Sequence, residues 1–444
     1  MQREDLIDIR TELPGPKAQY YLNLSRDFEP NSTTENVPCV WDHARGVNVW
    51  DVDNNKFLDF TSGVLVANVG HSNPELVIEI CDQANQMVNS YDFVNKYRGQ
   101  LAKKLVEICG PHFGKAFFVS AGTEAVEGAI KIARKYTGKK EIISFHGAFH
   151  GRTYMSMGLG GKRSGAGTRG FGPFPPQIYN IPYANCYRCA FGKSYPECDL
   201  QCLKYLDYFI DCATEKDVAA IIAEPYQGAP GTIIPPKEWF SGLQDWCRRN
   251  GALLIIDEVQ ASFGRSGKLF CYQHFDIEPD LLTLGKGISS SIPISAVIGR
   301  KEIMDVLTPG SLSSTHGGNA MSCRVALKNI EIILRDRLWE NSAMLGDYIL
   351  GRMKKVEQEV EALGEARGWG CVLGLEIVKS KKTREPDAKL ARQLNQDCWK
   401  KGLLMFAPIG HFGNVLRLAP PLVMTREQAS IACDILDEVF SKYR

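Results

Sequence analysis

The chain has 444 residues, of which 44% are hydrophobic and 23% charged, so it is of ordinary globular composition and too long for one simple core. Its 52 basic and 51 acidic residues leave a net charge of +1, which argues against a nucleic-acid or membrane-surface partner. Residues 1–17 lack the apolar run of a secretion signal, and no segment has the roughly 18 apolar residues of a membrane span, so we expect a cytoplasmic protein.

Residues 1–62 are expected to form the first part of a small domain. Within them, residues 49–63 (VWDVDNNKFLDFTSG) predict two short strands around an Asp-Asn-Asn turn. The C-terminal region, residues 326–444, adds amphipathic helices, strand candidates at 368–378 and 414–420, and a closing helix over 427–443. We expect the two ends of the chain to build one small α+β domain.

Residues 63–325 are expected to form a large domain. Short apolar runs alternate there with helical patterns, which predicts an α/β fold with a mostly parallel central sheet flanked by helices. The apolar runs are AFFVS (116–120), EIISF (141–145), VAAIIAEP (218–225), ALLIIDEV (252–259) and SAVIGR (295–300).

Two segments carry the residues that suggest chemistry. Asp257 and Glu258 end an apolar strand, where α/β sheets place their ligands, although a strand-end turn or a metal carboxylate has the same pattern. Lys286 stands between Gly285 and Gly287 after another apolar run. A surface lysine is the ordinary alternative, but this context suggests an amine on the floor of a site, nucleophilic toward a carbonyl.

These two segments resemble the class III aminotransferases of pyridoxal-5′-phosphate (PLP) fold type I. The matching stretches are LLIIDEVQASFGRSGKLF (253–270) and PDLLTLGKGISSSIPISAVIG (279–299), and the motifs are most similar to those of 4-aminobutyrate aminotransferases. The resemblance extends over nearly the whole chain. It departs mildly at Ala261 and Ser266, where relatives often have Thr or Ser and Thr respectively.

The resemblance implies that PLP is the cofactor and gives a role to the residues of these segments. Lys286 would hold PLP as a Schiff base and carry the proton between the substrate Cα and the cofactor C4′. Asp257 would keep the pyridine nitrogen protonated, so that the cationic ring accepts the electrons left by the broken Cα–H bond. Gln260 would be a hydrogen-bond partner of the phenolic oxygen.

The phosphate of PLP needs backbone N–H groups at a helix start, and residues 117–133 supply a strand, a turn of small residues and a helix. Gly122 and Thr123 are the expected cradle; a plain helix capped by Thr123 is the alternative. In the family a threonine of the partner subunit also reaches the phosphate. Thr315 has that place here, which implies a homodimer with shared sites, alone or within a tetramer.

Further positions follow from the same resemblance. Phe149 would lie on the pyridine ring with His150 beside it as a hydrogen-bonding histidine, and Glu224 would lie near the cofactor. Phe149 alone would be interpreted as a core residue. The side chains of Val64, Val66 and Tyr91 are expected to face the substrate. The alternative is that these residues belong to the hydrophobic core.

Two arginines are expected to bind substrate carboxylates, for which a guanidinium fork is suited. Arg152 matches the arginine that binds the distal carboxylate of 4-aminobutyrate, or the α-carboxylate in acetylornithine aminotransferases, and Arg417 matches the arginine that binds the α-carboxylate of glutamate. A surface salt bridge is the alternative for both. Ala229 replaces a glutamate that usually pairs with the second arginine, which weakens the assignment to 4-aminobutyrate.

Four cysteines form a C-x2-C-x8-C-x3-C pattern in a turn-rich insertion over residues 184–204. The spacing of Cys186, Cys189, Cys198 and Cys202 suits tetrahedral zinc or an iron–sulfur cluster with a structural role, and four reduced thiols are the alternative. The animal 4-aminobutyrate enzymes, which are similar, carry a C-x-x-C iron–sulfur site in this general region, but with a different pattern.

Several functions remain open on the sequence alone. The leading one is transfer of an amino group from an ω-amino acid such as 4-aminobutyrate, or from an α-amino acid, to 2-oxoglutarate or pyruvate by a ping-pong mechanism. An amino-acid racemase or epimerase, or a decarboxylating relative, would use the same motifs. A non-catalytic ligand sensor is disfavoured because Lys286 and Asp257 are present. A G-x-G-x-x-G match at Gly165, Gly167 and Gly170 lacks the strand and helix of a dinucleotide site.

Overall fold

The computed structural model describes residues 2–33, 36–161 and 169–443; Gly165 and Gly167 of the glycine match lie outside them. The chain forms two compact units. The larger unit comprises Glu75–Phe263 and Lys268–Arg335; the smaller unit comprises Met1–Pro74, Gly264–Gly267 and Asp336–Arg444. Both ends of the chain therefore belong to the smaller unit. Its bounds differ from those expected: residues 63–74 and 264–267 belong to the smaller unit rather than to the large domain, and residues 326–335 belong to the larger unit. Among the described residues, no helix is long and apolar enough to cross a membrane.

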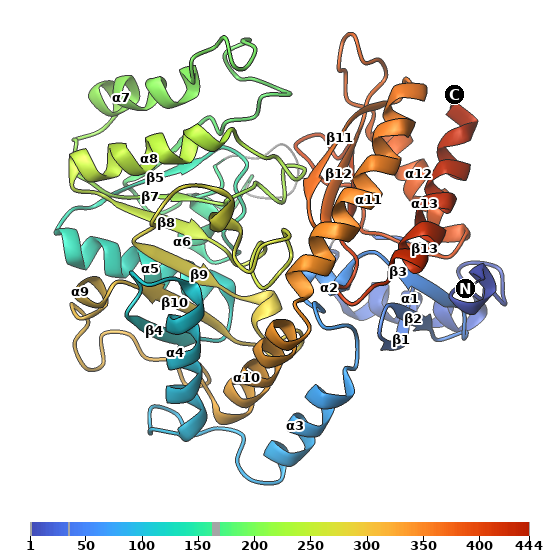
Figure 1. The fold of residues 1–444 in the computed structure, drawn as a ribbon, viewed down its shortest axis with the longest axis horizontal. Coiled ribbons are helices and arrows are strands. Elements are labelled where there is room, and N and C mark those ends of the chain that lie inside the picture. The colour runs from blue at the N-terminus through green and yellow to red at the C-terminus, as the bar shows by residue number, and fades with distance from the viewer. Residues whose placement is uncertain (1, 34–35, 162–168, 444) are drawn as a thin grey trace. The chain divides into compact units, whose positions relative to one another are not determined.

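The larger unit is built on a seven-stranded sheet in the order β4-β10-β9-β8-β7-β5-β6 (Figure 1). Its strands are β4 (Lys115–Val119), β5 (Glu141–Phe145), β6 (Ile178–Ile181), β7 (Val218–Ala223), β8 (Leu253–Asp257), β9 (Leu281–Leu284) and β10 (Ser295–Gly299). The strands β9, β8, β7, β5 and β6 are parallel to one another, and β10 is antiparallel to both of its neighbours. The mostly parallel sheet is thus confirmed.

Amphipathic helices cover this sheet, and α5 shows why. In α5 (Gly122–Thr137) the buried side chains of Val126, Ala129, Ile130 and Ala133 recur three or four positions apart, so they share one face that packs on the strands. The other helices of the unit are α3 (Pro74–Ala84), α4 (Lys96–Cys109), α6 (Tyr154–Gly158), α7 (Gln201–Ala213), α8 (Lys237–Asn250), α9 (Lys301–Met304) and α10 (Ala320–Arg335), with short 3-10 turns η2 (Cys271–His274) and η3 (Lys286–Ile288).

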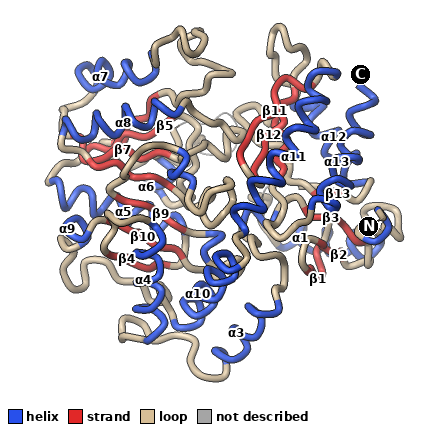
Figure 2. Tube along the Cα trace, in the orientation of Figure 1, coloured by secondary structure: helices blue, strands red, loops and turns tan. Residues whose placement is uncertain are grey.

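The smaller unit contains two sheets, drawn in red in Figure 2, in the orders β1-β2-β3-β13 and β11-β12-β14. The strands are β1 (Trp41–Arg45), β2 (Asn48–Asp51), β3 (Lys56–Asp59), β11 (Leu363–Trp369), β12 (Val372–Ile377), β13 (Leu403–Leu404) and β14 (Val415–Leu418). The helices are η1 (Arg3–Asp5), α1 (Pro16–Phe28), α2 (Ser62–Leu65), α11 (Leu338–Glu359), α12 (Ala388–Lys400), α13 (Arg426–Phe440) and η4 (Ser441–Tyr443). Antiparallel pairing of β2 with β3 confirms the hairpin predicted around the Asp-Asn-Asn turn.

The prediction of one strand over 368–378 is wrong in one respect. The structure has a hairpin there, in which β11 ends at Trp369 and β12 begins at Val372. The chain reverses through Gly370, whose φ of 51° lies in the left-handed region that glycine tolerates. An added Cβ at Gly370 would also lie 2.5 Å from the backbone nitrogen of Gly267. The turn therefore requires glycine.

Candidate active site

In the larger unit, the predicted site residues follow the same edge of the sheet. Asp257 ends β8, Glu224 follows β7, and Phe149 and His150 follow β5. Lys286 follows β9, the other parallel neighbour of β8. Because the carboxyl ends of parallel strands meet at one edge, chain segments far apart in the sequence converge there, at the place where α/β sheets bind ligands.

The carboxylate of Asp257 is held by three groups. Its Oδ1 accepts hydrogen bonds from the backbone N–H of Val259 at 3.0 Å and from the hydroxyl of Thr283 at 2.9 Å. Its Oδ2 lies 2.6 Å from Nδ1 of His150. The residue is 5% exposed, so its orientation is fixed in a nearly water-free environment.

Two titratable neighbours of Asp257, His150 and Glu258, have shifted pKa values. Burial lowers the pKa of His150, but the hydrogen bond and charge of Asp257 outweigh this effect and raise that pKa above its ordinary value. Burial raises the pKa of Glu258 to about 8, although hydrogen bonds from the backbone N–H groups of Tyr272 and Cys271 act to lower it. At neutral pH Glu258 is therefore largely protonated and adds little negative charge beside Asp257.

Glu224 ties two loops of this edge together. Its Oε1 accepts a hydrogen bond from the backbone N–H of Phe149, and its Oε2 one from that of Gly228, both at 3.0 Å. Burial raises the pKa of Glu224, and the charge of His150 opposes the rise. Glu224 therefore fixes the backbone that carries Phe149 and His150.

Gln260 presents an unsatisfied polar atom at this edge. Its Oε1 is buried and has no hydrogen-bond partner among the described residues, and neither has Nε2 of His150. A Cβ added at Gly228 would lie 2.0 Å from Oε1 of Gln260, so a larger residue there would displace the end of the Gln260 side chain. Buried atoms without partners are rare in folded proteins and mark places where a ligand or water binds.

Lys286 begins the short turn η3, directly after an extended Gly285. Its φ of 45° is left-handed, a conformation that costs a non-glycine residue about 1–2 kcal/mol. The side chain is half-buried. Since Asp257 pairs with Thr283 across β8 and β9, Lys286 lies three residues beyond the strand position opposite Asp257. Strained backbone of this kind is concentrated at functional sites.

The helix start at α5 differs from the simple capped helix that was the alternative. Thr123 is not the N-cap, because the helix begins at Gly122. Oε2 of Glu124 instead accepts hydrogen bonds from the backbone N–H groups of Ser120 at 2.7 Å and Ala121 at 3.0 Å. The hydroxyl of Thr123 lies 2.7 Å from that of Thr153. The first turn of α5 thus joins the segment that carries Arg152.

The other residues of the larger unit that were predicted to face the cofactor or substrate are at least partly exposed. Phe149 is half-buried, and the guanidinium of the exposed Arg152 lies 5.3 Å from its ring centroid. Thr315 is exposed. The hydroxyl of Tyr91 lies 3.2 Å from that of Ser313, so Tyr91 and the 313–315 segment are neighbours. Tyr91 is 47% exposed, which argues against its being a core residue.

Arg417 belongs to the smaller unit, in the middle of β14 opposite Gly374 of β12. It is only 5% exposed. Its guanidinium carbon lies 4.6 Å from the centroid of the Phe406 ring, within range of a cation–π interaction. The surface ion pair considered as the alternative for this arginine does not fit its burial, because a charge so deeply placed needs a defined set of partners.

Val64 also belongs to the smaller unit and lies in an unusual turn. Four consecutive residues from Ser62 to Leu65 have φ between 49° and 68°, a left-handed turn in which only Gly63 is glycine. The strain of the other three residues is about 3–6 kcal/mol in total. Val64 is 45% exposed at this turn. Val66, the other valine of the prediction, follows with an ordinary φ of −105°.

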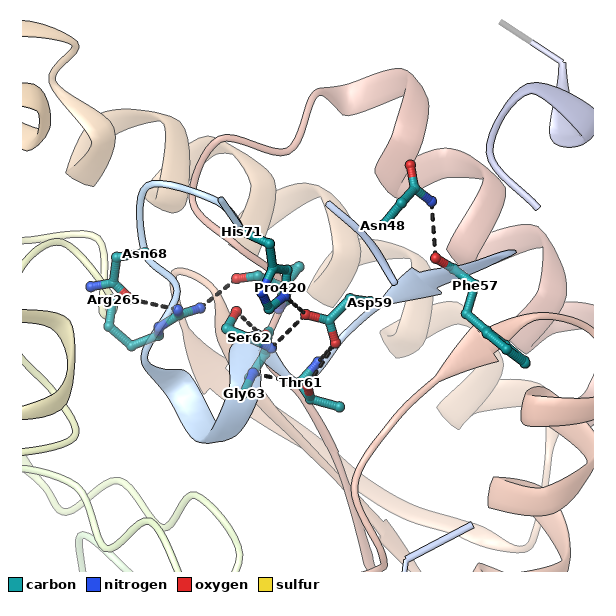
Figure 3. Close-up of polar contacts among 11 residues, drawn as sticks. Asn48, Phe57, Asp59, Thr61, Ser62, Gly63, Asn68, His71, Arg265 and Pro420 are labelled. Carbon is teal, nitrogen blue, oxygen red and sulfur yellow. Dashed lines mark hydrogen bonds and ion pairs between the residues drawn. The ribbon is translucent and has the colours of Figure 1, made fainter. Parts of the chain in front are cut away.

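A buried carboxylate holds this turn (Figure 3). Asp59, at the end of β3, accepts hydrogen bonds from the backbone N–H of Thr61 at 2.7 Å, its hydroxyl at 2.6 Å and the N–H of Ser62 at 2.9 Å. Nε2 of His71 lies 2.7 Å from the same carboxylate. The side chain of Asp59 is fully buried, so these bonds are strong enough to offset the backbone strain.

A buried arginine holds the chain that follows the turn. Arg265 donates to the side-chain oxygen of Asn68 at 2.7 Å and also bonds the carbonyl of Pro420 (Figure 3). It donates to the backbone oxygen of Cys371 at 3.0 Å as well. It is 0% exposed. One guanidinium therefore links three separate segments of the smaller unit near the left-handed turn.

We expect the Asp59→Ala variant to loosen the turn. Loss of the four contacts should lower the local free energy of opening by about 2–4 kcal/mol, because it leaves buried N–H groups unpaired beside strained backbone. Hydrogen–deuterium exchange of a peptide covering residues 60–68 should then quicken by tenfold or more. The matched control is Asp42→Ala, which removes an aspartate paired at 2.8 Å with a histidine, His43, on the surface. Equal changes in both variants would contradict the assigned role of Asp59.

The four clustered cysteines do not form a metal site in the structure. Cys186 is exposed, and Cys189, Cys198 and Cys202 are partly buried. Across the described residues, all four of these included, no group of three or more histidine, cysteine or acidic side chains is arranged to hold a metal ion. The expected zinc or iron–sulfur centre therefore finds no support in the geometry.

Three contributors were missed in the sequence. Thr283 is a lone polar residue in the apolar run LLTL, and this isolation was a usable signal. Asp59, two residues before a Thr-Ser-Gly turn, had the pattern of a side chain that bonds the backbone ahead of it. Nothing in the sequence around Phe406 indicates a role, because its ring comes to lie beside Arg417 of β14 only in the folded protein.

Comparison with known proteins gives a consistent result. Residues 30–440 match the sequence model of a family described as aminotransferase class-III. A probable 4-aminobutyrate aminotransferase of Bacillus subtilis is 36% identical over 398 residues, covering 88% of this chain and 90% of that protein. A leucine/methionine racemase of Thermococcus litoralis is 35% identical over 430 residues, covering 96% of each.

The fold agrees with these relatives. The crystal structure of a thermostable (S)-enantioselective omega-transaminase from Thermomicrobium roseum superposes with a TM-score of 0.88 at 30% identity, covering 97% of this chain and 99% of that one. The similarity therefore extends over nearly the full length. Proteins that are similar to this chain over nearly its full length are named for two different reactions, transamination and racemisation.

Proposed function

Because this chain belongs to the class III aminotransferases, we propose that it transfers an amino group from an ω- or α-amino acid to 2-oxoglutarate or pyruvate, with Lys286 as the residue that binds PLP. The observation that carries the proposal is the position of Lys286, which follows the strand next to the one that ends in the firmly held Asp257. A lysine amine can form a covalent bond to a carbonyl, and this is the chemistry the family requires.

The side chains of the larger unit fit PLP. The start of α5 offers backbone N–H groups and a positive dipole end to a phosphate through Gly122 and Thr123. Gln260 has a buried polar atom without a partner, which suits the polar rim of a bound ring, and Phe149 is a half-buried aromatic that can stack on it. When bound, PLP withdraws the electrons that remain at the substrate Cα after a bond to it breaks.

Asp257 and His150 would act as one unit toward the ring nitrogen. The carboxylate would keep a proton on that nitrogen through a charge-assisted hydrogen bond. Val259, Thr283 and His150 hold the carboxylate in place, so its orientation needs no adjustment when the cofactor binds. Lys286 would then move the proton between the substrate Cα and the cofactor C4′. Amino transfer requires this step, whereas binding of the substrate alone does not.

The substrate class follows from the arginines. Arg417, buried beside Phe406, suits the carboxylate of an α-amino acid or oxo acid, and the exposed Arg152 suits a second, distal carboxylate. Val64 on its strained turn and Tyr91 would limit the size of the side chain. Thr315 would come from the partner subunit of a homodimer, which explains why it is exposed in the single chain.

Racemisation of an α-amino acid is the second candidate. It is favoured by Ala229, which lacks the carboxylate that the family usually has at this position as a partner of the arginine that Arg417 matches. A racemase among the similar proteins shows that related chains of this length perform it. The two outcomes differ in whether the amino group leaves on the cofactor or returns to the same Cα.

A donor survey of PLP-saturated protein tests the proposal. Without an oxo acid, a transaminase should convert its donor in one turnover, so the visible absorption of the lysine-bound cofactor should decline with 4-aminobutyrate, ornithine or alanine, and recover when 2-oxoglutarate or pyruvate is added. A racemase should keep the absorption while L-alanine or L-leucine in deuterated water gains deuterium at Cα and loses chirality. If no amine changes the spectrum or exchanges its Cα hydrogen, the proposed activity is wrong.

A further inference from the structure

The four cysteines of the 184–204 insertion line one cavity of the larger unit. Its volume is about 20 Å³, the space of a single water molecule. Cys186 and Cys189 come from the turn before α7, Cys198 from the same irregular segment, and Cys202 from the first turn of α7. Residues separated by up to 16 positions in the sequence therefore present their thiols to one small space.

Electrostatic effects indicate that three of these thiols are neighbours. Burial, followed by negative charge at Cys186 and then at Cys198, raises the pKa of Cys202 to about 11. Charges at Cys186 and Cys198 also contribute to raising the pKa of Tyr195, after its hydrogen bond to Glu238. These contributions agree with the position of the thiols around one cavity.

The accessibility of the thiols is uneven. Cys186 is exposed, whereas Cys202 is partly buried and fixed by the helix. Redox-active cysteine pairs have this arrangement: a solvent-accessible thiol, here Cys186, reacts with the oxidant, and a less accessible neighbour, here Cys202, then forms the disulfide with it. Among the described residues, no group of three or more histidine, cysteine or acidic side chains is arranged there to hold a metal ion.

We propose that Cys186 and Cys202 form a reversible disulfide when the protein meets hydrogen peroxide, closing the insertion onto the first turn of α7. The Cys186 thiolate attacks one oxygen of the peroxide, the O–O bond breaks, and a sulfenic acid and one water result. The sulfur of Cys202 then displaces the hydroxyl of the sulfenic acid as a second water, and the S–S bond forms. Two thiols lose two electrons and two protons, and the peroxide is reduced to two waters.

The disulfide would lie close to the candidate active site of the same unit. Tyr183 lines the cysteine cavity, and its hydroxyl donates a hydrogen bond to the backbone oxygen of Glu224 at 3.0 Å. One side chain therefore connects the cavity to the residue that ties the Phe149 and Gly228 loops together.

Peptide mapping tests the pair. The PLP-saturated protein is treated with a small excess of hydrogen peroxide, its remaining thiols are alkylated, and a non-reducing tryptic digest is analysed by mass spectrometry. We expect the peptide with Cys186 to be linked to the peptide that contains both Cys198 and Cys202, two hydrogen masses lighter than the sum, and dithiothreitol should release it.

Four serine variants assign the partners. The link should disappear in Cys186→Ser and Cys202→Ser and persist in Cys198→Ser and Cys189→Ser, while the exposed Cys81 and Cys212 stay alkylated in all of them. Retention of the cofactor absorption shows that each variant is folded. A link that survives Cys202→Ser but not Cys198→Ser would overturn the pair. So would an untreated protein that holds one zinc ion per chain and protects all four thiols from alkylation.

Discussion

Lys286→Ala protein should lose the visible absorption of the covalently held cofactor and at least about a thousandfold in kcat/KM, while its fold is retained. The amine of Lys286 has two tasks in the proposed reaction, the covalent bond to PLP and the proton transfer at Cα, and alanine can perform neither. The substitution should also remove little packing from the core, because the side chain of Lys286 is only half-buried. In the proposed site PLP should still bind through the start of α5 and Asp257, so the variant should be colourless or show only the free aldehyde.

Borohydride reduction makes this test independent of activity. In the unmodified protein, reduction should fix one cofactor on the peptide that contains Lys286, and mass spectrometry should locate it there. The matched control is Lys301→Ala, which removes an exposed lysine at the start of α9 and should leave both absorption and labelling unchanged. Labelling of another lysine in the Lys286→Ala variant would show that the cofactor is held elsewhere.

The sequence predicted most strands of the larger sheet and the polar residues that follow them, because these depend on local patterns; it predicted neither β6 nor the order of the strands in the sheet. Each buried parallel strand is a short apolar run, and the polar residue that follows it is visible without a structure, as with Asp257 and Glu224. Lys286 was found in the same way, from its glycine neighbours. A family resemblance then supplied roles that strand patterns alone leave open.

The contacts that hold these residues in place were beyond the sequence. Thr283 and His150 bond the same carboxylate from positions 26 and 107 residues away, and only the register of β8 on β9 and the convergence of the strand ends bring them together. The left-handed turn around Val64 was also hidden. Ser62, Val64 and Leu65 disfavour that conformation individually, and the buried Asp59 is what imposes it.

Asp257→Asn is the second change with a large expected effect. Asparagine keeps the shape of the side chain but removes the charge that would hold a proton on the pyridine nitrogen, so kcat/KM should fall by about a thousandfold, or about 4 kcal/mol of transition-state stabilisation. The matched control is Thr283→Val, which removes one hydrogen bond to Oδ1 and leaves the charge in place. It should lose only severalfold. Similar losses in the two variants would mean that the charge of Asp257 is not what matters.

The same variant should reverse a pH dependence. In the native protein His150 has a raised pKa, so its pairing with Asp257 stabilises the fold fully below a pH of about 6.5, the ordinary histidine value, and the contribution is lost as pH rises through the raised pKa. In Asp257→Asn the hydrogen bond to a charged group is gone while burial remains. The pKa of His150 should then fall below its ordinary value, and acid should destabilise the folded protein.

The difference in melting temperature between native protein and Asp257→Asn should therefore widen as pH is lowered from 8 to 5.5. Thr283→Val provides the reference, because it leaves the His150–Asp257 pair intact at 2.6 Å and should differ from the native protein by an amount that does not depend on pH. A parallel response of the two variants would show that other groups cause the pH dependence. A widening confined to Asp257→Asn would identify the buried pair as one electrostatic unit, which is what positioning a proton on the cofactor ring requires.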